Sequence, residues 1–567
     1  MKTRRSTRSA SRPGIVLIAV LVVTVLLSLT AYQFSELMLQ EYAAAASSLK
    51  SQQARALADS GVYQVAAMLA DKDTLTGTLA NNPYDNQAAF GGIQVPGNAE
   101  GNLIGRFSII GPPDPDQTTS SQTIRYGVTD EAGKLNINAL VQIDSTGQVA
   151  HDALMKLPNM TEDIADAIID WIDADDNPRP NGAESSTYSG MQPPYRAKNG
   201  PLDSIEELLL VRGVTPRLLF GTDYNRNGIQ DPGEDDGSGW DPGWAAYLTV
   251  YSREQNLDVD RNPRIFLNDS NLKNLHDSLT TAVGQQLADF IILYRTQGGT
   301  GSTGSQSTGG GVAMQSATPV QASVTMSGGT SGGKSNVTIV LTPAPSGGQK
   351  SGNQSSNSSR PPTQATAQQI SDKVNQVLSS NSNSSQLRSL SSRYDLIGAS
   401  VTYTVGNGRN QQTLKVNSPL TDSSMAQMLP TLLDKTTTQN MGELPARVNV
   451  LTASAAVLAA LPGLTDTDVQ AIVAARPAPG DATDLAHTTP AWLKLDAKLD
   501  DTKMKALERY VTSRTQVYRV QSVGYFDQGG PTARVEAVID TNGGKPRIVM
   551  WRDLSDLGKG YDLTQQQ

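Results

Sequence analysis

The sequence has no cysteine and only three histidines, His151, His276 and His487, among its 567 residues. The lack of cysteine excludes disulfide bonds, thiolate zinc sites and thiol nucleophiles. The histidines are far apart in the sequence, so a histidine metal site or a Ser-His-Asp triad has few candidate residues. No glycine-rich loop stands between a predicted strand and a predicted helix, as phosphate-binding loops require. We therefore predict a protein that is not an enzyme.

Basic residues are also in short supply. The chain has 46 Lys and Arg against 55 Asp and Glu, which gives a net charge of -9 at pH 7. Binding to nucleic acid depends on Lys and Arg contacts to phosphates, so we do not expect a nucleic-acid partner. The length is sufficient for several domains.

The sequence begins with a basic segment, which is followed by a long apolar run. The run covers residues 15–27 and is interrupted only by Thr24. Five basic residues precede it: Lys2, Arg4, Arg5, Arg8 and Arg12. Such residues stay on the cytoplasmic side of a membrane, so the rest of the chain should be exported. Three routes remain open: cleavage of a signal peptide after Ala31, no cleavage, or removal of a leader by a cut between Gly14 and Ile15.

The apolar pattern continues beyond this run, and no proline occurs between Pro13 and Pro83. Apolar residues recur at helical spacing, among them Phe34, Leu37, Met38, Tyr42, Ala45 and Leu49. We predict a single transmembrane and stalk helix over residues 15–70, roughly 80 Å long at about 1.5 Å per residue. A cleaved signal peptide does not need such an extension, which favours a retained helix.

Strand patterns occur at both ends of the remaining sequence. Residues 103–110 and 123–129 are predicted strands near its start. Residues 517–525, 532–540 and 547–551 are predicted strands near its end. We expect the late strands to complete the sheet that the early strands begin.

A helix–turn–helix pattern preceded by a short strand with an Asn occurs between these strands. It covers residues 135–170 and 448–476, with a weaker copy at 266–295. DNA-binding helix-hairpin-helix proteins contain similar pairs, but Asp466 and Asp468 beside Gly463 would repel phosphate. We interpret the three copies as packing modules.

The sharpest local motif is the stretch DYNRNGIQDPGE at residues 223–234. Oxygen-bearing side chains occupy positions 1, 3, 5, 9 and 12, and Gly occupies position 6, which is the spacing of a calcium loop. Gln at position 8 and the lack of a following helix pattern indicate a single loop rather than an EF-hand pair. The alternative is an acidic surface turn without an ion. The predicted calcium ligands are Asp223, Asn225, Asn227, the carbonyl oxygen of Ile229, Asp231 and Glu234.

A second acidic block covers residues 170–214. It contains DWID at 170–173, GAE at 182–184, PYRAKN at 194–199 and EELLLVRGV at 206–214. This block resembles the most characteristic stretch of the minor pseudopilin K family of type II secretion systems (general secretion pathway protein K). The junction Arg12-Pro13-Gly14-Ile15 resembles the leader junction of type IV pilins and pseudopilins. Ala19 stands where most of them have Glu, and a missing Glu is typical of the K family.

The resemblance implies a calcium-binding helical domain. Its matching acidic positions form a possible second calcium site: Asp173, Asp175, Asp176 and Glu184. Helix capping and turn formation by the same side chains is the alternative.

The resemblance also implies an α+β fold, with a long N-terminal helix, a pilin-like antiparallel sheet, added helix-hairpin-helix-like modules and a low-complexity insertion. We expect a leader at 1–14, the transmembrane and stalk helix at 15–70, pilin-like strands at 71–135 and a helical domain with the calcium loops at 136–295. A Gly/Ser-rich insertion follows at 296–369. A segment with a helix and a strand comes next at about 370–445, with the helix predicted at 369–390 and the strand at 401–405. A second helical module at 446–515 and closing strands at 516–567 complete the chain.

The function that this resemblance implies is a non-enzymatic subunit at the tip of the secretion pseudopilus. Such a protein crosses the inner membrane once, with its N-terminus cytoplasmic and its bulk periplasmic. The implied partners are the minor pseudopilins I and J and a prepilin peptidase, and the implied cofactor is calcium. Two other classes remain open: a membrane-anchored helix-hairpin-helix DNA receptor and a calcium-dependent adhesion stalk.

Overall fold

The computed structural model describes residues 13–96, 104–113, 125–231, 233–234, 237, 239–300, 361–380, 387–406, 410–481 and 483–561. The chain forms two compact units. Unit 1 comprises residues 1–288, 389–397 and 419–567, and unit 2 comprises residues 289–388 and 398–418. The predicted leader and most of the predicted insertion lie outside the described residues.

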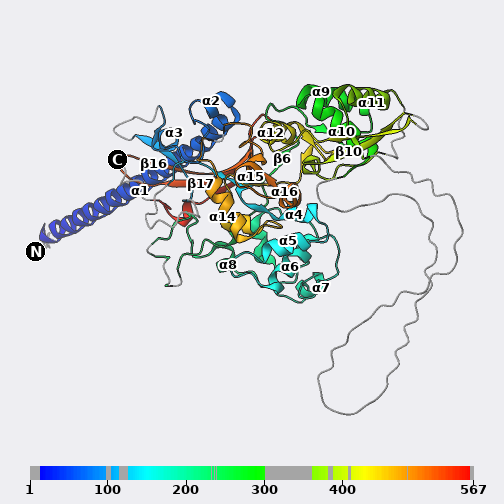
Figure 1. Cartoon of the computed structure of the whole chain (residues 1–567). Helices are drawn as coiled ribbons and strands as arrows, with labels where there is room; N and C mark the ends of the chain where they lie inside the picture. The colour runs from blue at the N-terminus through cyan, green and yellow to red at the C-terminus, as the bar shows by residue number, and fades with distance from the viewer. Residues whose placement is uncertain are drawn as a thin grey trace, which may run out of the picture. The chain divides into compact units, whose positions relative to one another are not determined.

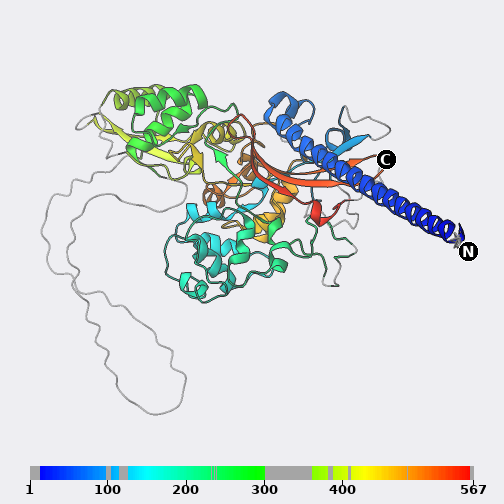
Figure 2. The ribbon, with the colours of Figure 1, turned by 180° about the vertical axis from the view of Figure 1, so that it is seen from behind.

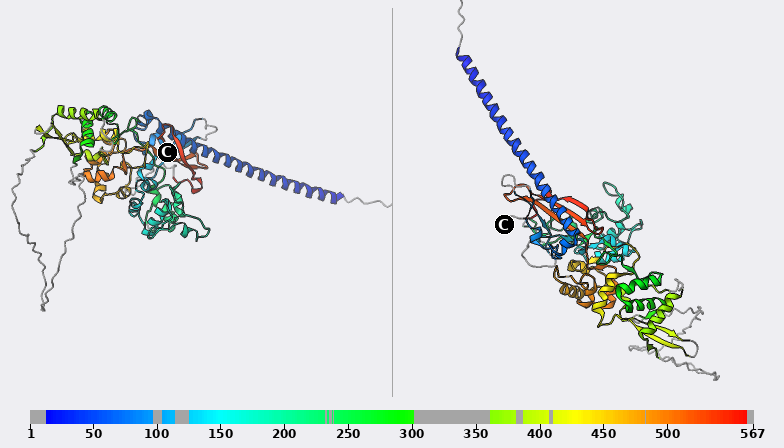
Figure 3. Two further views of the ribbon diagram at one scale, coloured as in Figure 1. Left: turned by 90° about the vertical axis from the view of Figure 1, so that its right-hand side faces the viewer. Right: turned by 90° about the horizontal axis from the view of Figure 1, so that it is seen from above.

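The predicted long helix is confirmed as α1 (Pro13–Ala70), which has 58 residues. Its large apolar side chains between Ile15 and Leu49 are exposed, whereas Ala54, Leu57 and Val62 are fully buried. Figure 1 and both views of Figure 3 show the N-terminal part of α1 extending away from the rest of unit 1. The helix therefore has a free half and a packed half.

The packed half of α1 lies on an antiparallel sheet, as Figure 2 shows. The strand order is β1 (Ile93–Gln94), β2 (Gly105–Ile110), β16 (Val517–Phe526), β17 (Ala533–Asp540) and β18 (Arg547–Asp553), and β3 (Thr129–Asp130) also pairs with β16. Because β2 pairs directly with β16, the early and late strands form one sheet, as the sequence predicts. Helix and sheet share one apolar core that includes Leu57, Val62, Phe107, Val520 and Val535.

Two glycines allow α1 to approach the sheet closely. A Cβ at Gly524 of β16 would lie 2.1 Å from the carbonyl oxygen of Ala54. A Cβ at Gly61 of α1 would lie 2.8 Å from the ring of Phe107. Since real Cβ atoms do not come this close to neighbouring atoms, larger residues at either position would push the helix away from the sheet.

The predicted strand at 123–129 is wrong over most of its described length. Only Thr129 lies in a strand, and Arg125 forms an isolated bridge with Gly111. The backbone between them bonds to a loop instead: Val128 donates to the Pro83 carbonyl at 2.9 Å, and the Tyr126 carbonyl accepts from Asn86 at 2.7 Å. These loop contacts use the groups that a strand ladder would need.

The helical modules are confirmed. The first contains α4 (Ile137–Ile143), α5 (Gln148–Leu154), α6 (Glu162–Ile172), α7 (Ser185–Tyr188) and α8 (Pro216–Phe220), with 3-10 turns at Ile205–Leu210 and Trp244–Ala246. The second contains α13 (Ala455–Ala459), α14 (Asp466–Ala475), α15 (Ala491–Leu495) and α16 (Asp501–Leu507). The weaker copy contains α9 (Leu272–Val283) and α10 (Gln285–Gln297).

Each module begins with a two-residue strand in a parallel bridge. The pairs are β4 (Leu135–Asn136) with β5 (Leu248–Thr249), β14 (Val448–Asn449) with β15 (Val511–Thr512), and β7 (Ile265–Phe266) with β12 (Thr436–Thr437). In the first two modules the turn before α6 or α14 contains a residue with positive φ, Asn159 at 58° or Gly463 at 79°. A Thr two residues later, Thr161 or Thr465, caps the next helix. The shared turn chemistry explains the sequence repeat.

The remaining short elements of unit 1 are α2 (Lys72–Thr76), α3 (Gln87–Phe90), α12 (Met425–Lys435) and the β6 (Glu254–Gln255) and β13 (Glu443–Leu444) pair. Unit 2 contains a four-stranded sheet in the order β8 (Gly299–Thr300), β10 (Ser400–Val405), β11 (Gln412–Asn417) and β9 (Thr363–Gln364). It also contains α11 (Ala367–Ser379), so the predicted helix at 369–390 is too long. The predicted strand at 401–405 is confirmed as part of β10.

Candidate functional site

The free half of α1 is the first candidate site. An 18-residue window of this helix has a mean hydropathy of 2.8, and none of it is buried. Within the described residues, α1 is the one helix whose length and composition suit a membrane span. Exposed apolar side chains continue beyond that window: Tyr32, Phe34, Leu37, Met38, Tyr42 and Leu49. This surface requires lipid or protein around it.

The predicted cut site lies at the beginning of α1. Gly14 and Ile15 are its second and third residues. A cut between them would remove the basic leader and leave the helix intact. The structure therefore places the two predicted cleavage residues where a leader could be removed without loss of the stalk.

The second candidate site is a cluster of carboxylates between α6 and α7. Asp173 is the C-terminal cap of α6, and Glu184 directly precedes α7. Asp173, Asp175 and Glu184 each offer one oxygen, and these oxygens lie within 4.8 Å of one another. Glu184 is 1% exposed, and both of its carboxylate oxygens are buried without a hydrogen-bond partner among the described residues. Unpartnered buried oxygens of this kind suit a hard cation.

The electrostatics of the cluster favour an added positive charge. Burial, together with the nearby carboxylates of Asp170 and Asp173, raises the pKa of Glu184 to about 8. Burial and the neighbouring Asp175 raise the pKa of Asp173 to about 6. A bound cation would offset both causes, because it replaces lost solvation and neutralises like charges.

Asp176 and Asn199 complete the surroundings of the cluster. Asp176 lies outside the three-residue group, and hydrogen bonding to Ser185 lowers the pKa of its carboxyl. Asn199 donates from Nδ2 to the Asp175 carbonyl at 2.6 Å, and its Oδ1 is buried without a hydrogen-bond partner. Sequence reasoning did not select Asn199 as a ligand, although it ends the PYRAKN motif.

Neighbouring residues of the same block hold the cluster in place. Both carboxylate oxygens of Asp170 accept the backbone N–H of Arg179 at 3.2 Å. A Cβ at Gly182 would lie 1.8 Å from an Asp170 oxygen, so the turn requires Gly there. The rings of Trp171 and Tyr188 pack edge to face with centroids 5.1 Å apart. These contacts explain why the DWID and GAE motifs occur together.

The third candidate site is the loop at 223–234. The Asp223 carboxylate accepts the N–H groups of Asn227 at 3.0 Å and Gly228 at 2.8 Å. The Glu234 carboxylate accepts those of Asn225 at 3.2 Å and Asp231 at 3.1 Å. Side-chain oxygens of positions 1 and 12 thus close the loop from both ends. Burial, with the Glu234 charge nearby, raises the pKa of Asp223 to about 6.

The loop differs from the cluster in one respect. Its three carboxylates do not form a group within 4.8 Å of one another among the described residues. Instead, Asn225 and Asn227 donate from their side-chain nitrogens to the same oxygen of Asp231, at 2.5 and 2.9 Å. Loop oxygens are therefore hydrogen-bonded within the protein.

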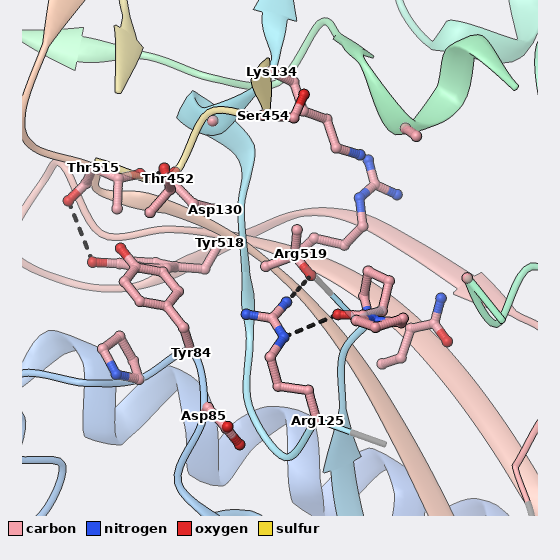
Figure 4. A pocket seen from close by; sticks show the side chains of 18 of the residues that line it. Tyr84, Asp85, Arg125, Asp130, Lys134, Thr452, Ser454, Thr515, Tyr518 and Arg519 are labelled. Atoms are coloured by element: carbon pink, nitrogen blue, oxygen red, sulfur yellow. Dashed lines mark hydrogen bonds between the residues drawn. The ribbon is translucent and has the colours of Figure 1, made fainter. Parts of the chain in front are cut away.

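A large cavity of about 1500 Å³ lies among the sheet, the first helical module and the second one. Figure 4 shows Arg125 on its wall, where it donates to the Pro112 carbonyl at 2.9 Å and to Thr129 at 3.4 Å. Arg519 pairs with Glu131 at 2.5 Å and with Glu536 at 3.0 Å. Among the described residues, the cavity lining contains no histidine and no cysteine. The ion pairs of Arg519 join β16 to the turn at Glu131 and to β17.

A long helix with an exposed apolar half and a second half packed on an antiparallel sheet is the arrangement that the sequence predicts for a pilin-like subunit. A family model described as type II secretion system (T2SS) protein K matches residues 133–220. A second model with the same description matches residues 448–507. In these two segments the chain is similar to protein K of type II secretion systems.

Individual relatives match in part. The chain is 34% identical over 116 residues to type II secretion system protein K of Pectobacterium carotovorum subsp. carotovorum, which is 20% of this chain and 35% of that protein. It is 27% identical over 216 residues to protein K of Klebsiella pneumoniae, which is 36% of this chain and 59% of that protein. Neither alignment reaches two thirds of the relative.

A solved structure is also similar: the GspK-GspI-GspJ complex of the enterotoxigenic Escherichia coli type 2 secretion system. The identity is 12% and the TM-score is 0.36, with 89% of this chain and 98% of that chain covered. The similarity to protein K depends on the two matched segments.

Proposed function

We propose that this protein is a non-enzymatic minor pseudopilin that takes part in protein secretion, at the tip of a type II secretion pseudopilus. The observation that carries the proposal is α1, whose exposed apolar half continues without a break into the half that packs on the sheet. The first half suits lipid and neighbouring helices, and the second half fixes the head to this rod. The two matched protein K segments support the same role.

The proposal includes a location and a processing step. The basic N-terminus stays in the cytoplasm, α1 crosses the inner membrane once, and the bulk of the chain is periplasmic. A prepilin peptidase cuts between Gly14 and Ile15. Ala19 lacks the carboxylate that would meet the new N-terminal amine of a neighbour, which suits an end position in the filament.

The proposed partners are the minor pseudopilins I and J of the same system. The test is co-purification of the full-length chain with these two subunits from membranes. A variant with Phe34→Ser, Leu37→Ser and Met38→Ser should lose most of the complex, because it removes exposed apolar surface from the stalk. The matched control, Ser47→Ala with Ser51→Ala on the same helix, should retain it. Equal recovery of partners with both variants would contradict the proposal.

We also propose that calcium is the bound cation. Asp173, Asp175 and Glu184 would hold one ion, with Asp176 and Asn199 beside them. The loop oxygens of Asp223, Asn225, Asn227, Ile229, Asp231 and Glu234 would hold a second. Calcium supplies charge neutralisation and six to eight coordination places there, which suits carboxylate, amide and carbonyl oxygens. Titration calorimetry with CaCl₂ should give two sites, and the Asp223→Ala, Glu234→Ala double variant should give one.

The DNA-receptor alternative has a direct test. A gel shift with duplex DNA at low salt should show no binding, since the acidic turn beside Gly463 opposes phosphate. Salt-sensitive binding would favour the alternative.

A further inference from the structure

The loop at 223–229 is docked on the sheet through three consecutive backbone carbonyls. The Asn225 carbonyl accepts from Arg534 of β17, and the Arg226 carbonyl accepts from Gln521 of β16 at 3.0 Å. The Asn227 carbonyl accepts from the hydroxyl of Tyr561 at 2.8 Å. These contacts join the loop to two strands and to the last described residues of the chain.

The segment 558–561 covers this junction. Tyr561 is 6% exposed and forms a small apolar cluster with Ile110 and Val523, against which Ile229 packs. The Gly560 carbonyl accepts from the side chain of Asn227. Gly560 has a φ of 71°, and a Cβ there would overlap the guanidinium of Arg534. The segment therefore lies directly on Arg534 and needs Gly at this place.

The burial of Arg534 beneath residues 558–561 is energetically unfavourable. Its side chain is among the largest fully buried ones, at 1% exposed. Nη2 donates to the Asn225 carbonyl, whereas Nε and Nη1 are buried without a hydrogen-bond partner among the described residues. A buried cation with unpaired N–H groups is unfavourable, and water would reach it if the segment lifted away. Burial accordingly lowers the pKa of Arg534.

We propose that residues 558–561 form a latch that holds the loop 223–229 on the sheet and can open. Tyr561 and the Asn227 contacts favour the closed state, and solvation of Arg534 favours the open state. Opening would free the carbonyl and the side chain of Asn227, so the loop would keep only its contacts with Arg534 and Gln521. This latch depends neither on the secretion role nor on a bound cation, so it can fail while the proposed function stands.

Limited trypsin digestion of the full-length chain in detergent tests the latch. Lys559 is exposed, and cleavage after it requires Gly560 and Tyr561 to leave the sheet. Intact-mass analysis reports the product that ends at Lys559. Tyr561→Phe removes the hydroxyl donor and should speed this cleavage about fivefold, because the rate follows the open population. The matched control Tyr63→Phe changes an exposed tyrosine of α1 and should cleave at the wild-type rate.

A second variant tests the opposing force. Arg534→Gln keeps an N–H donor and removes the buried charge, so cleavage after Lys559 should slow. Thermal melts of all variants separate latch opening from global unfolding. The latch is overturned if Tyr561→Phe and Tyr63→Phe cleave alike. It is also overturned if Arg534→Gln accelerates cleavage while its melting temperature is unchanged.

Discussion

The carboxylate cluster at 173–184 and the acidic loop at 223–234 use the same side-chain chemistry in different ways. In the cluster, the Glu184 oxygens are buried without a donor in the part of the chain that the structure describes. In the loop, the Asp223 and Glu234 oxygens each accept backbone N–H groups. The calcium-loop spacing predicts the site at 223–234, and the resemblance to the K family implies the one at 173–184. The difference teaches that the need for a cation depends on which oxygens the protein has already satisfied.

The largest expected difference between the two sites is their response to chelation. Removing calcium from the wild-type protein should lower the melting temperature by about 5 °C, since a saturated ion stabilises only the folded state. We expect the Asp173→Asn, Glu184→Gln variant to lose most of this shift. Asp203→Asn, which changes an exposed acid of the same module, should keep it. An unchanged melt of the wild type on chelation would contradict calcium binding at either site.

When chelator is present, alanine substitutions should have different effects on the free energy of unfolding at the two sites. Glu234→Ala leaves the N–H groups of Asn225 and Asp231 without an acceptor and should cost about 2 kcal/mol. Glu234→Gln keeps an acceptor and should cost less. Glu184→Ala removes a carboxyl group that lies among the carboxylates of Asp170, Asp173 and Asp176, so it should be neutral or stabilising. Urea unfolding measures these changes, and destabilisation by Glu184→Ala equal to that of Glu234→Ala would remove the contrast.

The smallest effect is a difference in pH dependence without calcium. The folded pKa of Glu184 is about 8, above its ordinary 4.5, so the folded state keeps a proton that the unfolded state loses. The free energy of unfolding should therefore fall as the pH rises from 5 to 8. For Asp223, with a pKa of about 6 against 3.8, the fall belongs below pH 6. Glu184→Gln should remove only the part of this decline that lies above pH 6. If the free energy of unfolding of Glu184→Gln still falls above pH 6, the assignment to Glu184 is wrong.

The fold could be predicted where local pattern and tertiary packing agree. Helix α1 followed from apolar spacing and the absence of proline, and the strands β16, β17 and β18 followed from alternation. The segment at 126–128 alternates like a strand, but its backbone bonds to the loop at 83–86. Partner choice of this kind is a property of the folded chain, so the sequence could not reveal it.

The candidate sites were predicted by residue type, and their internal organisation was not. Spacing selected Glu234 and the family resemblance selected Glu184, yet among the described residues the Glu184 oxygens lack a hydrogen-bond partner and Glu234 accepts from the backbone. The sequence did not reveal the roles of Asn199 and Arg534. Asn199 contacts Asp175 and Arg534 contacts Asn225, and both partners are distant in the sequence. Glycine is a poor helix former, yet Gly61 lies within α1, where the lack of a side chain admits the ring of Phe107.

The proposed filament role requires that the apolar half of α1 stays joined to its stalk after export. Determining the N-terminal residue of the mature protein, from membranes that contain a prepilin peptidase, tests this directly. We predict Ile15 as the first residue, with Met1 retained when the peptidase is absent. A mature chain that begins at Tyr32 would have lost the membrane-spanning half of α1, and the account of a filament subunit would be wrong.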